Sequence, residues 1–161
     1  MNDPFNLQRF LDAQSWNYEC ALQEIKNGLK RSHWVWYIFL QLKGFGRSYN
    51  SEYYGISGLE EARAYYNHTV LGSRLIEITN ELLGHSDKSA REILSPIDAR
   101  KVRSCMTLFW VASGNPLFKS VIDTFYEGRV DKRTIEKCEA VKKTSFVIEE
   151  SGENHLFTSV P

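Results

Sequence analysis

Apolar residues recur every three to four positions along most of this 161-residue chain, the spacing of helices that bury one face. In segment 15–30 the apolar positions that share one side are Tyr18, Ala21, Leu22, Ile25 and Leu29. A shorter pattern covers residues 4–12, and further ones cover 58–66, 70–84, 89–94, 96–113, 116–128 and 131–138. The chain therefore predicts a mainly helical protein.

Capping residues mark several of the predicted helix starts. Three pairs place a capping side chain before a proline suited to the first helical position: Asp3-Pro4, Ser95-Pro96 and Asn115-Pro116. Ser57 and Glu60 have the spacing of a capping box, in which each side chain satisfies a free amide of the first turn. We expect a single all-α domain, a compact bundle of about seven to eight helices.

The densest aromatic run is "RSHWVWYIFLQLKGFGRS", residues 31–48. A continuous apolar run fits a buried helix or a buried strand, and its periodicity does not separate the two. No neighbouring segment is a convincing strand partner, Ser32 can cap a helix and Gly44 can end one. We therefore predict a helix between Ser32 and Gly44.

The last twenty residues differ from the rest of the chain. "TSFVIEE" and "HLFTSV" favour strands and flank the turn-like "SGEN". We expect residues 1–141 to form the helical domain and residues 142–161 a C-terminal extension, either a β-hairpin or a disordered tail.

Charge and cysteine usage narrow the function classes. Lys and Arg together number 20, as do Asp and Glu, so no net field attracts a polyanion and nucleic-acid binding is not favoured. The three cysteines are odd in number and far apart, which favours a reducing compartment. The first twenty residues do not resemble an export signal, and the longest apolar run is too short to cross a membrane. We expect a cytoplasmic protein without membrane contact.

Polar side chains on the segment 96–113 need an explanation, because "CMTLFWVA" is apolar nearly all round and predicts a helix through the middle of the bundle. Arg100, Arg103 and Thr107 share one stripe, and Lys101 and Ser104 share the next. An unpaired buried guanidinium is very costly. Arg103 therefore has a carboxylate partner, a position at the rim, or an anionic ligand.

The aromatic run supplies residues that suit an anionic, nucleotide-like ligand. Basic and polar groups stand at both of its ends, and rings able to stack on a planar group lie within it or soon after it. The candidate binding residues are Arg31, Ser32, His33, Trp34, Trp36, Arg47, Ser48, Tyr53, Arg103, Ser104 and Thr107. The alternative is that the rings are core and the arginines extend to solvent.

Standard catalytic motifs are absent. The chain has no GxxxxGK[ST] motif, no GxSxG elbow and no His or Cys spacing typical of a metal site, so we expect neither a metal nor a cofactor. His33 and His68 are the candidate proton carriers near neutral pH. Whether the protein is an enzyme stays open.

Six motifs in order resemble the uncharacterised bacterial family catalogued as domain of unknown function 1810, whose members are sometimes labelled calpastatin. They are "LQRFLDAQ", "KRSHWVWYIFLQL", "GRS", "YYGIS", "EARAYYNHTVLGSRL" and "VRSCMTLF", and the resemblance spans Phe5 to Cys138. It implies a mainly α-helical domain and no established activity. The chain departs from the family pattern at Leu40 and Thr69, where prolines are expected.

The family's signature also matches most of the candidate binding residues and His68. The matching positions are Arg31, Ser32, His33, Trp34, Trp36, Gly46, Arg47, Ser48, His68, Arg103, Ser104 and Thr107. Two hypotheses follow: a domain that binds a small anionic ligand, and a protein-interaction module with an exposed aromatic face. Arginines that converge on an open cavity without carboxylate partners would favour the first.

Overall fold

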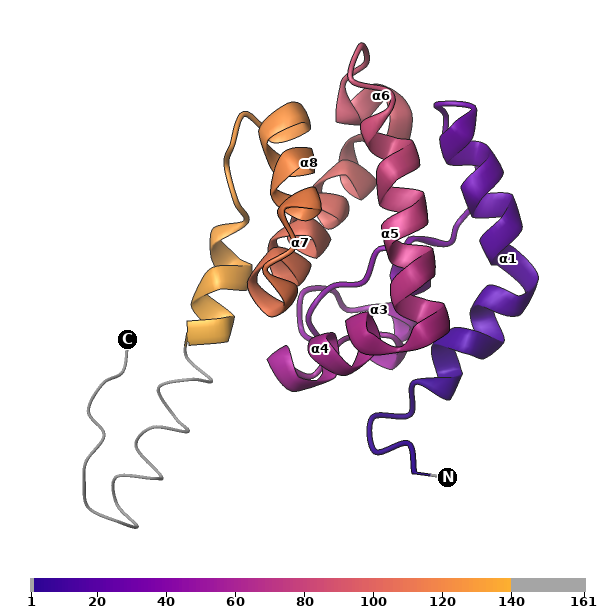
Figure 1. The fold of residues 1–161 in the computed structure, drawn as a ribbon, viewed down its shortest axis with the longest axis vertical. Coiled ribbons are helices and arrows are strands. Elements are labelled where there is room, and N and C mark those ends of the chain that lie inside the picture. Colours follow the sequence, from indigo (N-terminus) through magenta and orange to yellow (C-terminus); the bar gives the residue numbers. More distant parts are fainter. Residues whose placement is uncertain (1, 140–161) are drawn as a thin grey trace.

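The computed structural model describes residues 2–139, which form a helical bundle (Figure 1). Its helices are α1 (Gln8–Lys26), α2 (Val35–Ile38), α3 (Tyr49–Tyr53), α4 (Leu59–Asn67), α5 (Thr69–Leu83), α6 (Ala90–Leu94), α7 (Pro96–Ser113) and α8 (Pro116–Tyr126). Residues 132–139 are helical as well. Within residues 2–139 there is no β-strand, so the all-α fold is confirmed. The predicted extension 142–161 lies outside the described residues.

Helix α7 forms the centre of the bundle, as the sequence indicates. It packs against α4, α6, α8 and α2, while α5 lies between α1 and the α7–α8 pair (Figure 1). Val102, Cys105 and Phe109 on α7 are completely buried, and burial raises the pKa of the Cys105 thiol. A helix with neighbours on several sides must be apolar on several sides, which explains why the segment "CMTLFWVA" is apolar nearly all round.

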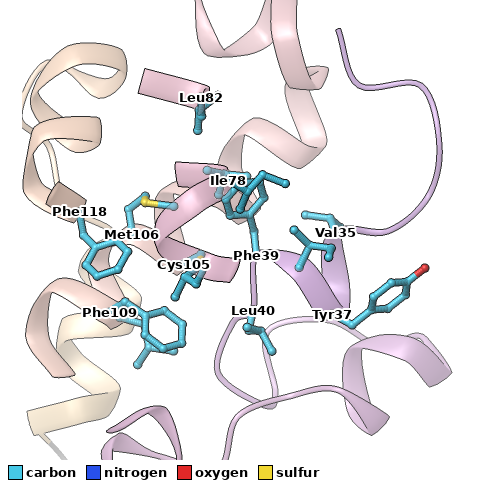
Figure 2. Close-up of a cluster of buried hydrophobic side chains, with 14 of the residues drawn as sticks. Val35, Tyr37, Phe39, Leu40, Ile78, Leu82, Cys105, Met106, Phe109 and Phe118 are labelled. Carbon is cyan, nitrogen blue, oxygen red and sulfur yellow. The ribbon is translucent and has the colours of Figure 1, made fainter. Parts of the chain in front are cut away.

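Part of the core lies where the aromatic run approaches α7 (Figure 2). Side chains from four segments interdigitate there, and the labelled ones are Val35, Tyr37, Phe39, Leu40, Ile78, Leu82, Cys105, Met106, Phe109 and Phe118. Burying rings of this size stabilises the fold by about 2–3 kcal/mol each. Most of the aromatic run is therefore core.

The predicted helix between Ser32 and Gly44 is wrong. Its helical part is the single turn α2, and from Phe39 to Ser48 the backbone is not helical. Beyond it, Leu42 and Ile56 form an isolated parallel bridge. The backbone amide of Lys43 donates to the carbonyl of Ile56, and the amide of Ile56 donates to the carbonyl of Gln41, both at 2.9 Å. These hydrogen bonds satisfy the backbone in place of further helical turns.

Residues 8–26 form one helix, α1, rather than two short ones. Asp3 caps it from outside, because its carboxylate accepts hydrogen bonds from the amides of Leu7 at 2.8 Å and Gln8 at 3.0 Å. These two bonds lower the pKa of the Asp3 carboxyl. Asp3 therefore caps a helix as predicted, but that helix begins at Gln8, so Pro4 does not occupy its first position.

A buried ion pair joins α1 to α4. Arg9, 7% exposed, contacts Glu61, 3% exposed, at 2.8 Å. The Arg9 guanidinium also donates to the backbone carbonyls of Tyr53 and Gly55, so it fixes the loop before α4. Glu61, not Glu60, accepts hydrogen bonds from the amide and hydroxyl of Ser57, at 2.9 Å each. The predicted capping box of Ser57 and Glu60 is therefore wrong: the N-cap is Gly58, and within residues 2–139 the Ser57 hydroxyl donates to Glu61 and accepts no hydrogen bond from an amide of the first turn.

Candidate functional site

A cavity of about 430 Å³ opens between the segment 36–51, the first half of α7 and residues 131–133. We call it the Trp36 cavity. Five of the candidate binding residues line it: Trp36, Arg47, Ser48, Arg103 and Ser104. They come from segments more than fifty residues apart, so the fold brings together what the sequence separates. Its volume lies within the range of small-molecule sites.

The Trp36 cavity is strongly cationic. Its lining includes five basic side chains, Arg47, Arg100, Lys101, Arg103 and Arg133, and one carboxylate, Asp131. Lys101 lies 3.7 Å from the carboxylate of Asp98. Within residues 2–139 the four arginines form no ion pair. A protein without net charge thus concentrates positive charge on one cavity, which attracts anions.

Arg103 lies on α7 against the segment that leads to residues 132–139. One guanidinium nitrogen, Nη2, donates to the carbonyl of Val130 at 2.8 Å. Its Nε is buried and has no hydrogen-bond partner among the described residues. Buried donors without a partner are rare in native proteins, and strain, a catalytic role, or a bound water or ion accounts for those that occur. Arg103 is therefore a half-buried cation with one donor that no described group satisfies.

A hydrogen-bond network fixes the wall beside Arg103. The carboxylate of Asp131 accepts from the hydroxyl of Ser104 at 3.0 Å and from the hydroxyl of Thr134 at 2.5 Å. The hydroxyl of Thr107 accepts from the amide of Asp131 and donates to the carbonyl of Arg103, both at 2.9 Å. Thr107 is completely buried and does not line the Trp36 cavity. It positions Asp131 and Arg103 from behind.

Two aromatic rings, those of Trp36 and Phe45, also line the Trp36 cavity. The Lys101 ammonium lies 4.6 Å from the centre of the Trp36 ring, and the Arg133 guanidinium lies 4.1 Å from the centre of the Phe45 ring. Such cation–π contacts hold basic groups beside a hydrophobic surface without neutralising them. Phe45 and Arg133 are not among the candidates from sequence. The ring between the glycines of "GFGRS" is the signal that points to Phe45.

Arg31, Ser32 and Trp34 surround a different group, the carboxylate of Glu24. It accepts from the amide of Arg31 at 2.8 Å, from the hydroxyl of Ser32 at 2.6 Å and from the Trp34 ring nitrogen at 2.8 Å. Partial burial would raise the pKa of Glu24, but the hydrogen bonds from Ser32, Arg31 and Trp34 outweigh it and lower that pKa to about 2. Trp34 is 1% exposed. These residues tie α1 to the start of the aromatic run and do not line the Trp36 cavity.

The two histidines and Tyr53 also lie apart from the Trp36 cavity. His68 caps α5, because its Nδ1 accepts from the amides of Val70 and Leu71, both at 3.2 Å. His33 is exposed. Tyr53 stacks on Tyr49 at 5.6 Å between ring centres. The structure therefore does not bring either histidine to the arginines.

Neither a metal cluster nor a membrane span is present within residues 2–139. No group of three or more His, Cys, Asp or Glu side chains there is arranged to hold a metal ion. None of the helices described is both long and apolar enough to traverse a bilayer.

Fold and site together define a small all-α domain with a cationic, aromatic-walled cavity beside its central helix. The model of a family described as "Protein of unknown function (DUF1810)" matches residues 4–138, and the chain belongs to this family. The fold is similar to the crystal structure of the conserved hypothetical protein Rv1873 from Mycobacterium tuberculosis, with a TM-score of 0.84 and 42% sequence identity. That match covers 85% of this chain and 99% of the mycobacterial one. No curated protein matches the sequence.

Proposed function

We propose that the protein binds a small, phosphate-bearing ligand of nucleotide type in the Trp36 cavity. The observation that carries the proposal is the convergence of four unpaired arginines on one cavity beside two rings. Guanidinium groups recognise phosphate oxygens in pairs, and indole and phenyl rings stack on planar bases. Groups of both kinds line this one cavity.

Arg47 and Arg103 are the central phosphate contacts in this proposal. Arg47 is exposed at the rim, whereas Arg103 is half-buried and anchored to the carbonyl of Val130. A rim arginine attracts the anion and a half-buried one holds it in a site of lower dielectric, where charge-assisted hydrogen bonds are stronger. Ser48 and Ser104 add hydroxyl groups to the same lining.

Binding without catalysis is the better-supported version. The two candidate proton carriers, His33 and His68, do not line the Trp36 cavity. The hydroxyl that α7 contributes to the lining, that of Ser104, donates a hydrogen bond to Asp131. A general base must lie within hydrogen-bond reach of the proton that it abstracts. We therefore assign the described site a binding role.

The protein-interaction alternative loses the surface on which it depended. That hypothesis needed an exposed aromatic face on residues 34–40, but most of these side chains are buried in the core: Trp34, Val35, Tyr37, Ile38, Phe39 and Leu40. Trp36 is half-buried and belongs to the Trp36 cavity.

A thermal-shift screen tests the proposal. The panel contains AMP, GMP, CMP, UMP, inorganic phosphate and, as uncharged references, the four nucleosides. A ligand at a hundred times its dissociation constant stabilises the fold by about 2.7 kcal/mol, which is a shift of roughly 5–10 °C for a protein of this size. We expect at least one nucleotide to give such a shift and its nucleoside to give none.

Three variants make the screen specific for the cavity. Arg47→Ala and Arg103→Ala should lose most of the shift. Arg63→Ala is the matched control, since Arg63 also donates one hydrogen bond to a backbone carbonyl, that of Ala112 at 3.1 Å, but lies on α4 away from the cavity lining. A panel in which no nucleotide stabilises the wild type would refute the proposal, and so would a shift that survives in both cavity variants.

A cytoplasmic location is part of the same proposal. Cys105 and Cys138 are buried among apolar side chains. Buried thiols in this setting suit a reducing compartment, where nucleotides are abundant.

A further inference from the structure

A second cavity, of about 600 Å³, lies on the other side of Arg100 and Arg103. We call it the Tyr126 cavity. Its lining comes from the start of α6, the first turns of α7 and the end of α8 with the residues that follow, and it includes Arg91, Arg100, Arg103, Phe125, Tyr126 and Arg129. Arg100 and Arg103 line both cavities. The two spaces are therefore neighbours that share a pair of arginines.

Aromatic rings line both of the cavities that share Arg100 and Arg103. Beyond this pair on one side lie the rings of Trp36 and Phe45, and on the other the rings of Phe125 and Tyr126. Arg100 and Arg103 are three residues apart on one helix, which sets their Cβ atoms about 5–6 Å apart. That spacing lets two guanidinium groups contact two linked phosphoryl groups at once.

The segment that faces α7 supports the same geometry. Arg129 lines the Tyr126 cavity and Asp131 lines the Trp36 cavity, while Val130 between them accepts the hydrogen bond from Arg103. The Arg103 guanidinium thus lies at the boundary of the two spaces. Its Nε has no hydrogen-bond partner among the described residues, so an unsatisfied donor lies where the two cavities meet.

We propose that the ligand spans both cavities and is a dinucleotide, two nucleosides joined by a diphosphate. This rests on the proposed function and specifies its ligand class. The diphosphate lies on Arg100 and Arg103, one base lies against Trp36 and Phe45, and the other lies in the Tyr126 cavity. Arg91 and Arg129, both exposed, add positive charge on that far side. Arg129 is partly neutralised by Glu127 at 2.6 Å.

Tyr126 is a fixed part of the far wall. Its hydroxyl donates to the carbonyl of Ala99 at 2.6 Å, and burial raises its pKa. The ring is therefore held against α7 and stays neutral at physiological pH, which suits an apolar wall rather than an acid–base group.

Isothermal titration calorimetry on the full chain tests the proposal with four probes: AMP, ADP, inorganic pyrophosphate and diadenosine diphosphate. NAD serves as a second dinucleotide in case the far cavity rejects adenine. We expect one of the dinucleotides to bind at least tenfold more tightly than AMP and ADP, because it contacts two walls and two arginines at once.

The double variant Arg91→Ala/Arg129→Ala separates the two cavities. Both side chains are exposed, so the fold should be unaffected. Dinucleotide affinity should fall several-fold while AMP affinity stays unchanged. Arg47→Ala, on the near side, should weaken both ligands, and Arg63→Ala should weaken neither.

The outcomes distinguish the two proposals. AMP binding as tightly as either dinucleotide, or a double variant that weakens AMP and dinucleotide equally, overturns the two-cavity proposal and leaves nucleotide binding in the Trp36 cavity standing. Binding of pyrophosphate as tight as that of the dinucleotides shows that the rings are not used and also overturns it. If none of the nucleotides binds, both proposals fail.

Discussion

Removing the carboxylate of Glu61 is expected to destabilise the fold far more than removing that of its neighbour Glu60. The Glu61 side chain is 3% exposed and contacts the buried guanidinium of Arg9 at 2.8 Å, whereas Glu60 is exposed in the same helical turn. Glu61→Ala leaves a buried positive charge without its partner. Breaking a buried pair in this way typically costs 3–5 kcal/mol.

The remaining contacts of Arg9 place the loss near the lower end of that range. Its guanidinium keeps hydrogen bonds to the carbonyls of Phe5, Asn6, Tyr53 and Gly55, between 2.6 and 3.1 Å. These dipoles partly solvate the charge, so we expect Glu61→Ala to lower the free energy of unfolding by about 3 kcal/mol, or the Tm by roughly 6–12 °C. Glu60→Ala removes only a favourable interaction with the helix dipole, worth about 0.3–1 kcal/mol.

Urea unfolding followed by circular dichroism measures both variants. The variant Glu61→Gln adds an internal test, because its amide oxygen can still accept hydrogen bonds from Arg9 and Ser57, so it should cost less than Glu61→Ala. Equal losses for Glu60→Ala and Glu61→Ala would refute the reasoning, since the ion pair would then contribute nothing that an exposed carboxylate does not.

Three further predictions concern other parts of the chain. Glu24→Ala should lower the free energy of unfolding by about 1–3 kcal/mol at neutral pH. Because folding lowers the pKa of Glu24 from 4.5 to about 2, the stabilisation by its carboxylate is complete above pH ~5 and is lost toward pH 2. The difference in free energy of unfolding between wild type and variant should therefore shrink as the pH falls from ~5 to ~2. Gly72→Ala should lower the free energy of unfolding by about 1–3 kcal/mol, because a Cβ there would lie 1.9 Å from the carbonyl oxygen of Tyr66. Gly58→Ala should be tolerated, because a Cβ at that position meets no atom within 4 Å. The midpoints of urea unfolding measure both effects. Asp131→Asn should raise nucleotide affinity a few-fold in calorimetry, since it removes the carboxylate from the cationic lining; weaker binding would count against an anionic ligand.

The helical fold could be read from the sequence because spacing and caps agree along most of the chain. Ser95 and Asn115 begin α7 and α8 as predicted, with prolines at the first helical positions. The helix predicted for the aromatic run was wrong because the run is buried on nearly all sides. Such burial removes the hydrophobic periodicity that distinguishes a helix from irregular chain. Its pairing with Ile56 depends on a contact between distant segments, which no local pattern records.

The candidate site was predicted in part, for a similar reason. Arg47 and Arg103 were recognisable as basic residues without a local partner, and the fold brings them to one cavity. Ser32 and Trp34 were candidates from the same aromatic run, but their hydrogen bonds go to Glu24, eight and ten residues away. Tertiary packing determines whether a polar side chain contacts a carboxylate or lines a cavity. The sequence could therefore propose the candidate residues but could not tell which of them line the Trp36 cavity.

A crystal structure of the protein with the nucleotide that gives the largest thermal shift tests the central claim most directly. We expect a phosphate within hydrogen-bond distance of the Arg47 and Arg103 guanidinium groups and a base against the Trp36 ring. A nucleotide bound elsewhere on the molecule, with Arg103 still donating to Val130 alone, would contradict the account.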